Sequence, residues 1–131
     1  RKADLLAREH NVSIKYHDHN LLDFPYPANF FDVVALIFVH LPSGIRPLIH
    51  NKFIDSLKPE GFLFIEAFSK SQLGRGSGGP GSEDLLYDRY LLNRDFQLLE
   101  IFDLRETEEV LDEGPGHQGS AALVRMLGQK L

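Results

Sequence analysis

FDVVALIFV, residues 31–39, is the stretch that decides the fold of this chain. Its residues are apolar nearly throughout and rich in β-branched side chains, which is typical of a strand covered on both faces of a parallel sheet. We therefore expect this strand to lie at the centre of a sheet. His40 follows the strand directly.

The residues after this strand predict a crossover to a second strand. A Pro-Ser pair at residues 42–43 interrupts the chain, and apolar residues then recur at helical spacing over residues 45–57. Residues 58–61, Lys-Pro-Glu-Gly, predict a turn, and residues 61–68, GFLFIEAF, predict a second buried strand. Strand, helix and strand in this order form a parallel crossover unit, so the sequence predicts an α/β fold.

The residues before the first strand predict a helix, an edge strand and a loop. Residues 3–9 have the spacing of a short helix, which Asn11 can end in a left-handed conformation. Residues 12–16 alternate between apolar and polar side chains, as in a half-buried or edge strand. Residues 17–27 are polar and contain two prolines, so we expect a loop there.

The second half of the chain predicts a mobile loop, a short helix and two strands. Residues 69–82 are rich in glycine and poor in apolar side chains, and we expect a surface loop outside the core. Ser82 is placed to cap a helix that runs to about Asn93. Strands are predicted over residues 97–104 and 120–127; with only an acidic connection between them, we expect an antiparallel pair.

Composition bounds the class of protein. The chain has 131 residues, 43% of them hydrophobic, which suits a single domain with one core. Its net charge of -5 includes no basic stripe, so we expect no nucleic-acid partner. No apolar run approaches the ~20 residues of a membrane span, and residues 1–4 do not have the pattern of a signal peptide, so we expect a cytoplasmic protein. The absence of cysteine excludes disulfides and thiolate metal sites.

Residues 74–79, GRGSGG, satisfy the dinucleotide-binding pattern G-x-G-x-x-G. In that motif the first glycine follows the strand at once and the last opens a helix. Here residues 69–73 intervene, and Pro80 and Gly81 delay the next helix. We therefore favour a lid or linker, and keep a nicotinamide-dependent oxidoreductase that uses this loop as an alternative.

His17 and His19 flank Asp18 and could present two imidazoles on one side of the chain. A zinc or iron site needs at least one further ligand, and no partner follows from the spacing. The sequence therefore predicts no metal site.

Several short motifs carry a family resemblance. The order Phe-Asp-Val-Val (31–34), His-Leu-Pro (40–42) and Leu-Lys-Pro-Glu-Gly (57–61) resembles the second half of class I S-adenosylmethionine-dependent methyltransferases. Gln-Leu (72–73), Gly-Gly-Pro (78–80), Asp-Leu-Leu-Tyr (84–87), Asp-Glu-Gly (112–114) and His-Gln-Gly (117–119) resemble a tellurite-resistance-type bacterial subgroup. The resemblance extends from Lys2 to Lys130.

The resemblance implies a fold. Residues 1–131 correspond to the C-terminal part of a single methyltransferase domain, without the glycine loop that grips the methionine part of the cofactor. The implied sheet is Rossmann-like and lacks its first two strands. It is mostly parallel, with an antiparallel C-terminal strand pair.

The resemblance also implies a set of site residues. Asn20 and Leu21 fall where the family contacts adenine, and Phe38 and Val39 end the strand beneath the sulfonium of S-adenosylmethionine. The loops that contain Gln72, Gly79 and Glu113 are expected to cover the methyl acceptor. If the acceptor must lose a proton, His40 or His117 is the candidate base, since imidazole titrates near neutral pH.

We therefore expect the intact parent protein to transfer a methyl group from S-adenosylmethionine to a small molecule, and this fragment to be inactive alone. The competing class is a non-catalytic α/β binding or assembly module. A sheet without its first two strands would leave the edge of residues 31–39 unpaired, which favours aggregation. We expect a second copy to cover that edge, as a homodimer or by strand exchange, unless the preceding segment is disordered or cleaved.

Overall fold

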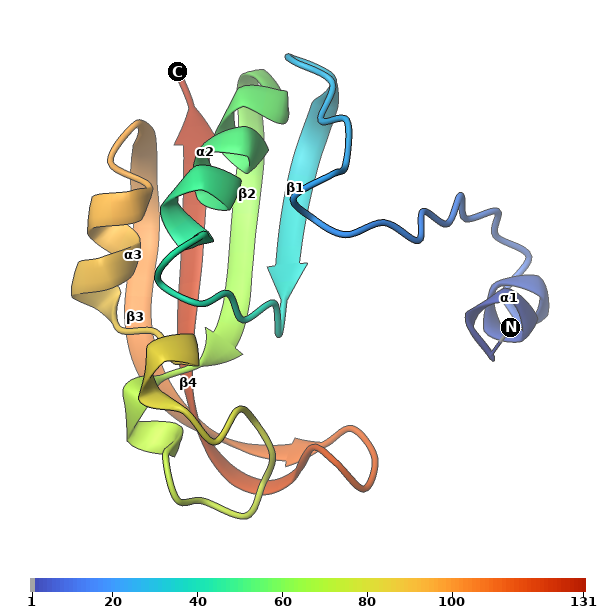
Figure 1. Cartoon of the computed structure of the whole chain (residues 1–131). Coiled ribbons are helices and arrows are strands. Elements are labelled where there is room, and N and C mark those ends of the chain that lie inside the picture. Colours follow the sequence, from blue (N-terminus) through green and yellow to red (C-terminus); the bar gives the residue numbers. More distant parts are fainter. Residues whose placement is uncertain (1) are drawn as a thin grey trace.

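The computed structural model describes residues 2–131, and four strands in it form one sheet in the order β1-β2-β4-β3 (Figure 1). β1 (Phe31–Ile37) pairs in parallel with β2 (Leu57–Phe68). β4 (Gln118–Lys130) lies between β2 and β3 (Leu99–Asp112) and is antiparallel to both. The predicted α/β class and the predicted antiparallel terminal pair are confirmed.

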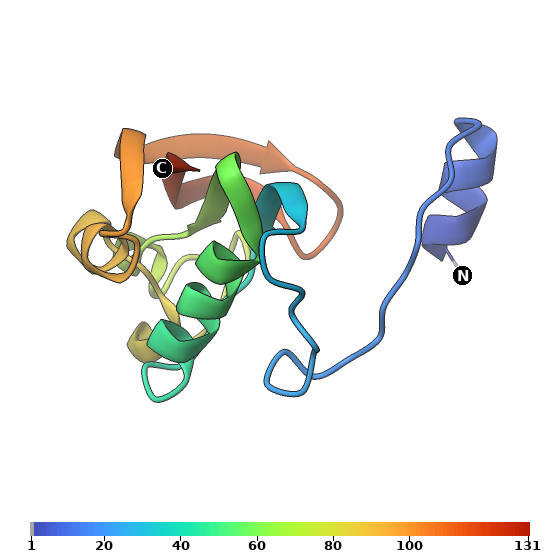
Figure 2. The ribbon, with the colours of Figure 1, turned by 90° about the horizontal axis from the view of Figure 1, so that it is seen from above.

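Two helices cover one face of the sheet (Figures 1 and 2). α2 (Arg46–Ser56) connects β1 to β2, and α3 (Arg89–Asp95) precedes β3. Their apolar sides pack on alternate residues of the strands, which point to the same face. This core contains Leu36, Ile49, Phe53, Ile54, Leu57, Leu63, Ile65, Leu92, Phe96 and Met126.

The opposite face of the sheet is bare of helices (Figure 2). Val33 and Ile37 of β1 are 50% and 55% exposed there, and Phe64 and Phe102 are 42% and 54% exposed. α1 (Lys2–Glu9) stands apart from the sheet instead of covering this face. Its predicted end is confirmed, because Asn11 has a left-handed backbone with φ of 55°.

β1 is an edge strand of the described sheet, so the expectation of a central strand is wrong for residues 2–131. The strand predicted over residues 12–16 is also wrong. That segment is irregular, and Val12, Ile14 and Tyr16 are 53%, 52% and 48% exposed. An alternating pattern forms a strand only where a neighbouring strand accepts its backbone hydrogen bonds, and no strand lies beside this segment.

The turn predicted over residues 58–61 lies inside the irregular start of β2. Glu60 has φ of 66°, and the pairing register with β1 shifts between Phe31 and Val33. A Cβ atom on residue 61 would lie 2.9 Å from the Lys58 carbonyl oxygen, so only glycine fits here without a shift of the backbone. The chain therefore enters the sheet earlier than the turn motif indicates.

The helix predicted from Ser82 begins later. A short 3₁₀ turn, η2 (Glu83–Leu85), is followed by extended chain, and α3 starts after Asp88, whose carboxylate accepts the Leu91 N–H at 2.7 Å. β3 and β4 are also longer than predicted, because the acidic connection is strand up to Asp112. Charged side chains are compatible with a strand whose second face is open to water.

The glycine-rich loop is packed, so the prediction that it stays outside the core is wrong for part of it. It begins with a 3₁₀ turn, η1 (Lys70–Gln72), and Gln72 and Ser77 are only 2% and 4% exposed. Gly78 has φ of +114°, and a Cβ on it would lie 2.3 Å from the Gly116 carbonyl oxygen. The loop therefore touches the turn between β3 and β4.

Two glycines in this loop give a matched test of that packing. Gly78→Ala should lower the free energy of unfolding by about 2–4 kcal/mol, because the side chain meets both a left-handed backbone and a carbonyl. Gly76→Ala should leave it unchanged or raise it by up to about 1 kcal/mol, since Gly76 has no atom within 4 Å of its Cβ position. Urea denaturation measures both; equal effects would contradict the packed loop.

Candidate functional site

Five rings meet at the carboxyl ends of β1 and β2, and we call Phe38, His40, Phe68, Tyr87 and His117 the aromatic cluster. Ring centroids lie 4.8 Å apart for Phe38 and Phe68, and 4.5 Å apart for Phe38 and His117. His40 lies 5.7 Å from Phe68 and 5.3 Å from Tyr87. Three predicted site residues, Phe38, His40 and His117, are therefore brought together by the fold.

Phe38 turns the chain at the tip of β1. Its N–H donates to the Glu66 carbonyl at 2.7 Å, the last bond between the two strands. Its backbone is left-handed, with φ of 52°, which costs about 1–2 kcal/mol for a residue with a side chain. The turn places the ring between Phe68 and His117, half-buried.

Tyr87 fixes the loop that follows Phe38. Its hydroxyl donates to the Val39 carbonyl and accepts the Leu41 N–H, both at 2.9 Å. The side chain is buried, and burial raises the pKa of Tyr87 above its usual value. Tyr87 belongs to the Asp-Leu-Leu-Tyr motif of residues 84–87, but nothing in that motif predicts bonds to the loop after β1.

His40 has both ring nitrogens engaged. Nδ1 lies 2.7 Å from the Leu85 carbonyl oxygen, and Nε2 accepts the Phe68 N–H at 3.3 Å. A carbonyl oxygen only accepts, so Nδ1 carries the proton and the ring is neutral. Burial lowers the pKa of His40, against the opposing effect of the Leu85 bond. His40 in this arrangement holds neighbouring backbone and has no nitrogen left to take a proton.

His117 is placed differently. It closes the turn between β3 and β4, where the Glu113 N–H donates to the His117 carbonyl at 3.0 Å. Its Nδ1 lies 3.5 Å from Glu113 Oε2, longer than a hydrogen bond, and its side chain is 32% exposed. Nε2 has no hydrogen-bond partner among residues 2–131, so His117 is the better-placed base of the two.

Gln72 is a buried clamp. Its amide nitrogen donates to Ser77 Oγ and to the Gly78 carbonyl, both at 2.9 Å, and its amide oxygen accepts the Ala122 N–H at 2.8 Å. Gly79 packs on Phe68, since a Cβ there would lie 2.8 Å from the ring. Both predicted acceptor-binding residues thus shape the loop, and direct contact with an acceptor stays a prediction.

Asn20 and Leu21 lie beside the amino half of β1. The Asn20 side chain accepts the Leu22 N–H at 2.9 Å in a tight turn. Leu21 lines an apolar cavity of about 320 Å³ together with Val33 and Val34. Asn20 and Leu21 therefore lie near the start of β1, whereas Phe38 and Val39 follow its end. The contact of Asn20 and Leu21 with adenine stays a prediction.

Two further observations bear on site chemistry. No group of three His, Asp or Glu side chains among residues 2–131 is arranged to hold a metal ion, and the rings of His17 and His19 lie 6.1 Å apart. Within the same residues, no helix has the length and apolar character that a membrane crossing requires.

Comparisons place the fold among known structures. No family model and no curated protein matches the sequence. A SAM-dependent methyltransferase from Methanosarcina mazei matches with a TM-score of 0.67 at 16% identity, over 98% of this chain and 76% of that one. NodS, an N-methyltransferase from Bradyrhizobium japonicum WM9 in complex with S-adenosylhomocysteine, gives 0.68 at 12% identity, over 98% and 61%. The chain has a methyltransferase fold.

TehB from Haemophilus influenzae also matches, with a TM-score of 0.72 at 14% identity. This match covers 98% of the chain and 45% of TehB, so the chain spans less than half the length of that protein. The predicted class is thus confirmed as a fold. The tellurite-resistance-type subgroup stays a prediction.

The bonding of His40 predicts its protonation. Long-range ¹H–¹⁵N NMR should show a neutral ring with the proton on Nδ1 near neutral pH, and a titration midpoint below the ordinary value of 6.5. In His117→Gln the midpoint should rise but stay below that value, because burial is the larger cause and His117 a smaller one. A proton on Nε2, or an unshifted midpoint, would contradict this geometry.

Proposed function

We propose that the intact protein uses this methyltransferase fold to transfer a methyl group from S-adenosylmethionine to a small-molecule acceptor. The observation that carries the proposal is the aromatic cluster at the carboxyl ends of β1 and β2, in a fold shared with methyltransferases. Open α/β sheets generally bind ligands at this edge. The chain spans 45% of TehB, and we expect it to be inactive alone.

The residues at this edge suit the cofactor. S-adenosylmethionine, when bound, supplies an electrophilic methyl group on a positively charged sulfonium. The rings of Phe38 and Phe68 lie 4.8 Å apart, and aromatic faces stabilise a nearby cation. Phe38 and Val39 would form the floor beneath this charge. Asn20 and Leu21 lie away from this edge, beside the amino half of β1, and would contact adenine there.

The turn of His117 would face the acceptor. Glu113 lies close enough to orient the imidazole if the Nδ1–Oε2 distance of 3.5 Å shortens, which leaves Nε2 to accept a proton. His40 and Gln72 would act as positioning residues, since their polar atoms are already bonded within the chain. Alignment of acceptor and donor accounts for most of such a rate enhancement.

A non-catalytic binding or assembly module is the second candidate, and the bare face of the sheet favours it. Val33, Ile37, Phe64 and Phe102 are each at least 42% exposed there, and exposed apolar surface often marks a contact site. The oxidoreductase alternative has less support. Gly78 and Gly79 pack against Gly116 and Phe68, and the following helix begins only after Asp88.

The free edge of β1 is where a second copy would pair. In a homodimer or by strand exchange, a strand of the second copy would bond to the backbone groups of β1 that have no partner strand among residues 2–131. Sedimentation equilibrium tests this proposal, and a purely monomeric species at micromolar concentration would contradict it.

Cofactor binding separates the first two candidates. Calorimetric titration of the intact protein with S-adenosylhomocysteine should give measurable heat, and Phe38→Ala should weaken binding by about tenfold through lost ring contact. Phe102→Ala is the matched control, since Phe102 lies on the bare face and should leave binding unchanged. Absence of heat and of thermal stabilisation at millimolar ligand would favour the binding module.

A further inference from the structure

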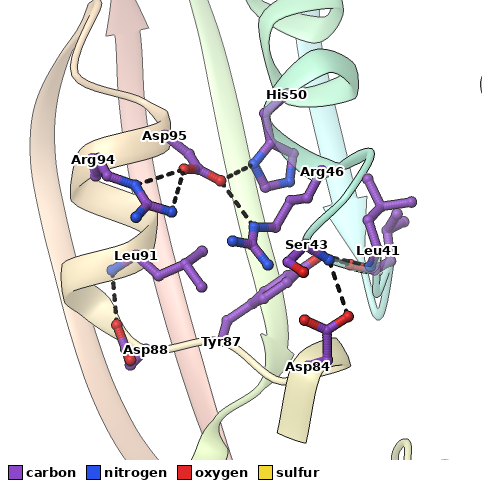
Figure 3. Close-up of polar contacts among 11 residues, drawn as sticks. Leu41, Ser43, Arg46, His50, Asp84, Tyr87, Asp88, Leu91, Arg94 and Asp95 are labelled. Carbon is purple, nitrogen blue, oxygen red and sulfur yellow. Dashed lines mark hydrogen bonds and ion pairs between the residues drawn. The ribbon is translucent and has the colours of Figure 1, made fainter. Parts of the chain in front are cut away.

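Arg46 is the first residue of α2, and its side chain is only 5% exposed. Nε donates to Asp95 Oδ2 at 3.0 Å (Figure 3). The two terminal nitrogens have no hydrogen-bond partner among residues 2–131. Arg46 also lines a cavity of about 310 Å³. Every fully buried side-chain nitrogen among residues 2–131 has a partner, so the two terminal nitrogens of Arg46 keep some exposure. A guanidinium group offers five N–H donors, and donors without a partner in the chain favour an acceptor from a ligand.

Asp95 holds this guanidinium in place from α3. Its carboxylate is 2% exposed and also accepts from His50 Nδ1 at 3.1 Å, while Oδ1 accepts from Arg94 (Figure 3). Burial lowers the pKa of His50 to about 4, so the ring is neutral at pH 7. One carboxylate thus faces two guanidinium groups, and the cluster keeps a net positive charge that Arg46 directs into the cavity.

The other walls of the cavity have mixed chemistry. Lys70 adds a second cation, which pairs with Asp88 at 2.7 Å. Glu83 and Asp84 add carboxylates; Asp84 accepts the Ser43 N–H at 3.1 Å, and hydrogen bonding to the side chain and backbone of Ser43 lowers the pKa of Asp84 below its usual value. Leu86 and Leu91 supply apolar surface. Cations, anions and apolar groups therefore line one small volume.

We propose that this cavity binds a small zwitterion of the amino-acid class, with its carboxylate on the terminal nitrogens of Arg46 and its ammonium toward Asp84 and Glu83. A planar guanidinium binds a carboxylate with two parallel hydrogen bonds. The two acidic side chains repel a nucleotide or another polyanion. The volume is at the lower end for ligand sites, which suits a molecule of few heavy atoms.

None of the residues that line this cavity belongs to the aromatic cluster, and ligand binding here does not rest on methyl transfer. ¹H–¹⁵N correlation spectra of the chain, titrated with L-alanine to tens of millimolar, should shift the amides of Ser43, Arg46 and Lys70. Propionate, which has the carboxylate alone, should bind about tenfold more weakly, as expected for one lost charge-assisted contact. Absence of shifts, or equal binding of the two probes, would overturn the proposal.

Two variants assign the carboxylate contact. Arg46→Gln should weaken L-alanine binding by at least about tenfold. Arg94→Gln removes the other guanidinium on Asp95, but Arg94 is 66% exposed and does not line the cavity, so binding should be unchanged. Equal losses in both variants would contradict direct contact with Arg46.

A third variant assigns the ammonium contact, and it keeps the proposal testable if Arg46→Gln does not fold. Asp84→Asn should weaken L-alanine binding and leave propionate binding the same or stronger, because it removes a charge that attracts only the ammonium. Asp84 is on an exposed turn, so this variant should fold even if Arg46→Gln does not. Weaker binding of both probes would overturn the assigned orientation. Binding of S-adenosylhomocysteine by the intact protein tests the other proposal independently.

Discussion

The parallel ladder between β1 and β2 determines where this chain can place its chemistry. Parallel strands end at the same edge of a sheet, so Phe38 and Phe68 meet there. β4 then runs antiparallel to β2, and its first residues return to that edge. This brings the turn of His117 against the two phenylalanine rings, although it comes from the far end of the sequence.

Buried polar groups then hold this edge in one arrangement. Tyr87 bonds the loop after β1, Gln72 bonds the glycine-rich loop to β4, and His40 bonds the chain at Phe68 and Leu85. No fully buried side-chain nitrogen or oxygen in residues 2–131 is without a partner. Loss of a partner for such a group costs about 1–3 kcal/mol, so each of these bonds stabilises the arrangement of loops at this edge.

Sequence pattern predicted those elements that local periodicity determines. Residues 31–37 and the helix now seen as α2 follow from apolar spacing, and the antiparallel terminal pair follows from the short acidic connection between its strands. The strand expected over residues 12–16 failed because a strand requires a partner that periodicity cannot supply. The clamps of Tyr87 and Gln72 were missed because their partners lie 48 and 50 residues away in the chain. The position of the Arg46 side chain could not be predicted either, because it is set by a bond to Asp95 on a different helix.

Amide hydrogen exchange along β1 tests the ladder most directly. The Phe38 N–H donates to β2, and alternation along the strand points the amides of Val34 and Leu36 the same way. We expect these three amides to exchange at least about a hundredfold more slowly than those of Val33, Ala35 and Ile37, which face the free edge. Equal, fast exchange of both sets would show that β1 does not pair with β2 and would contradict the fold on which both proposals rest.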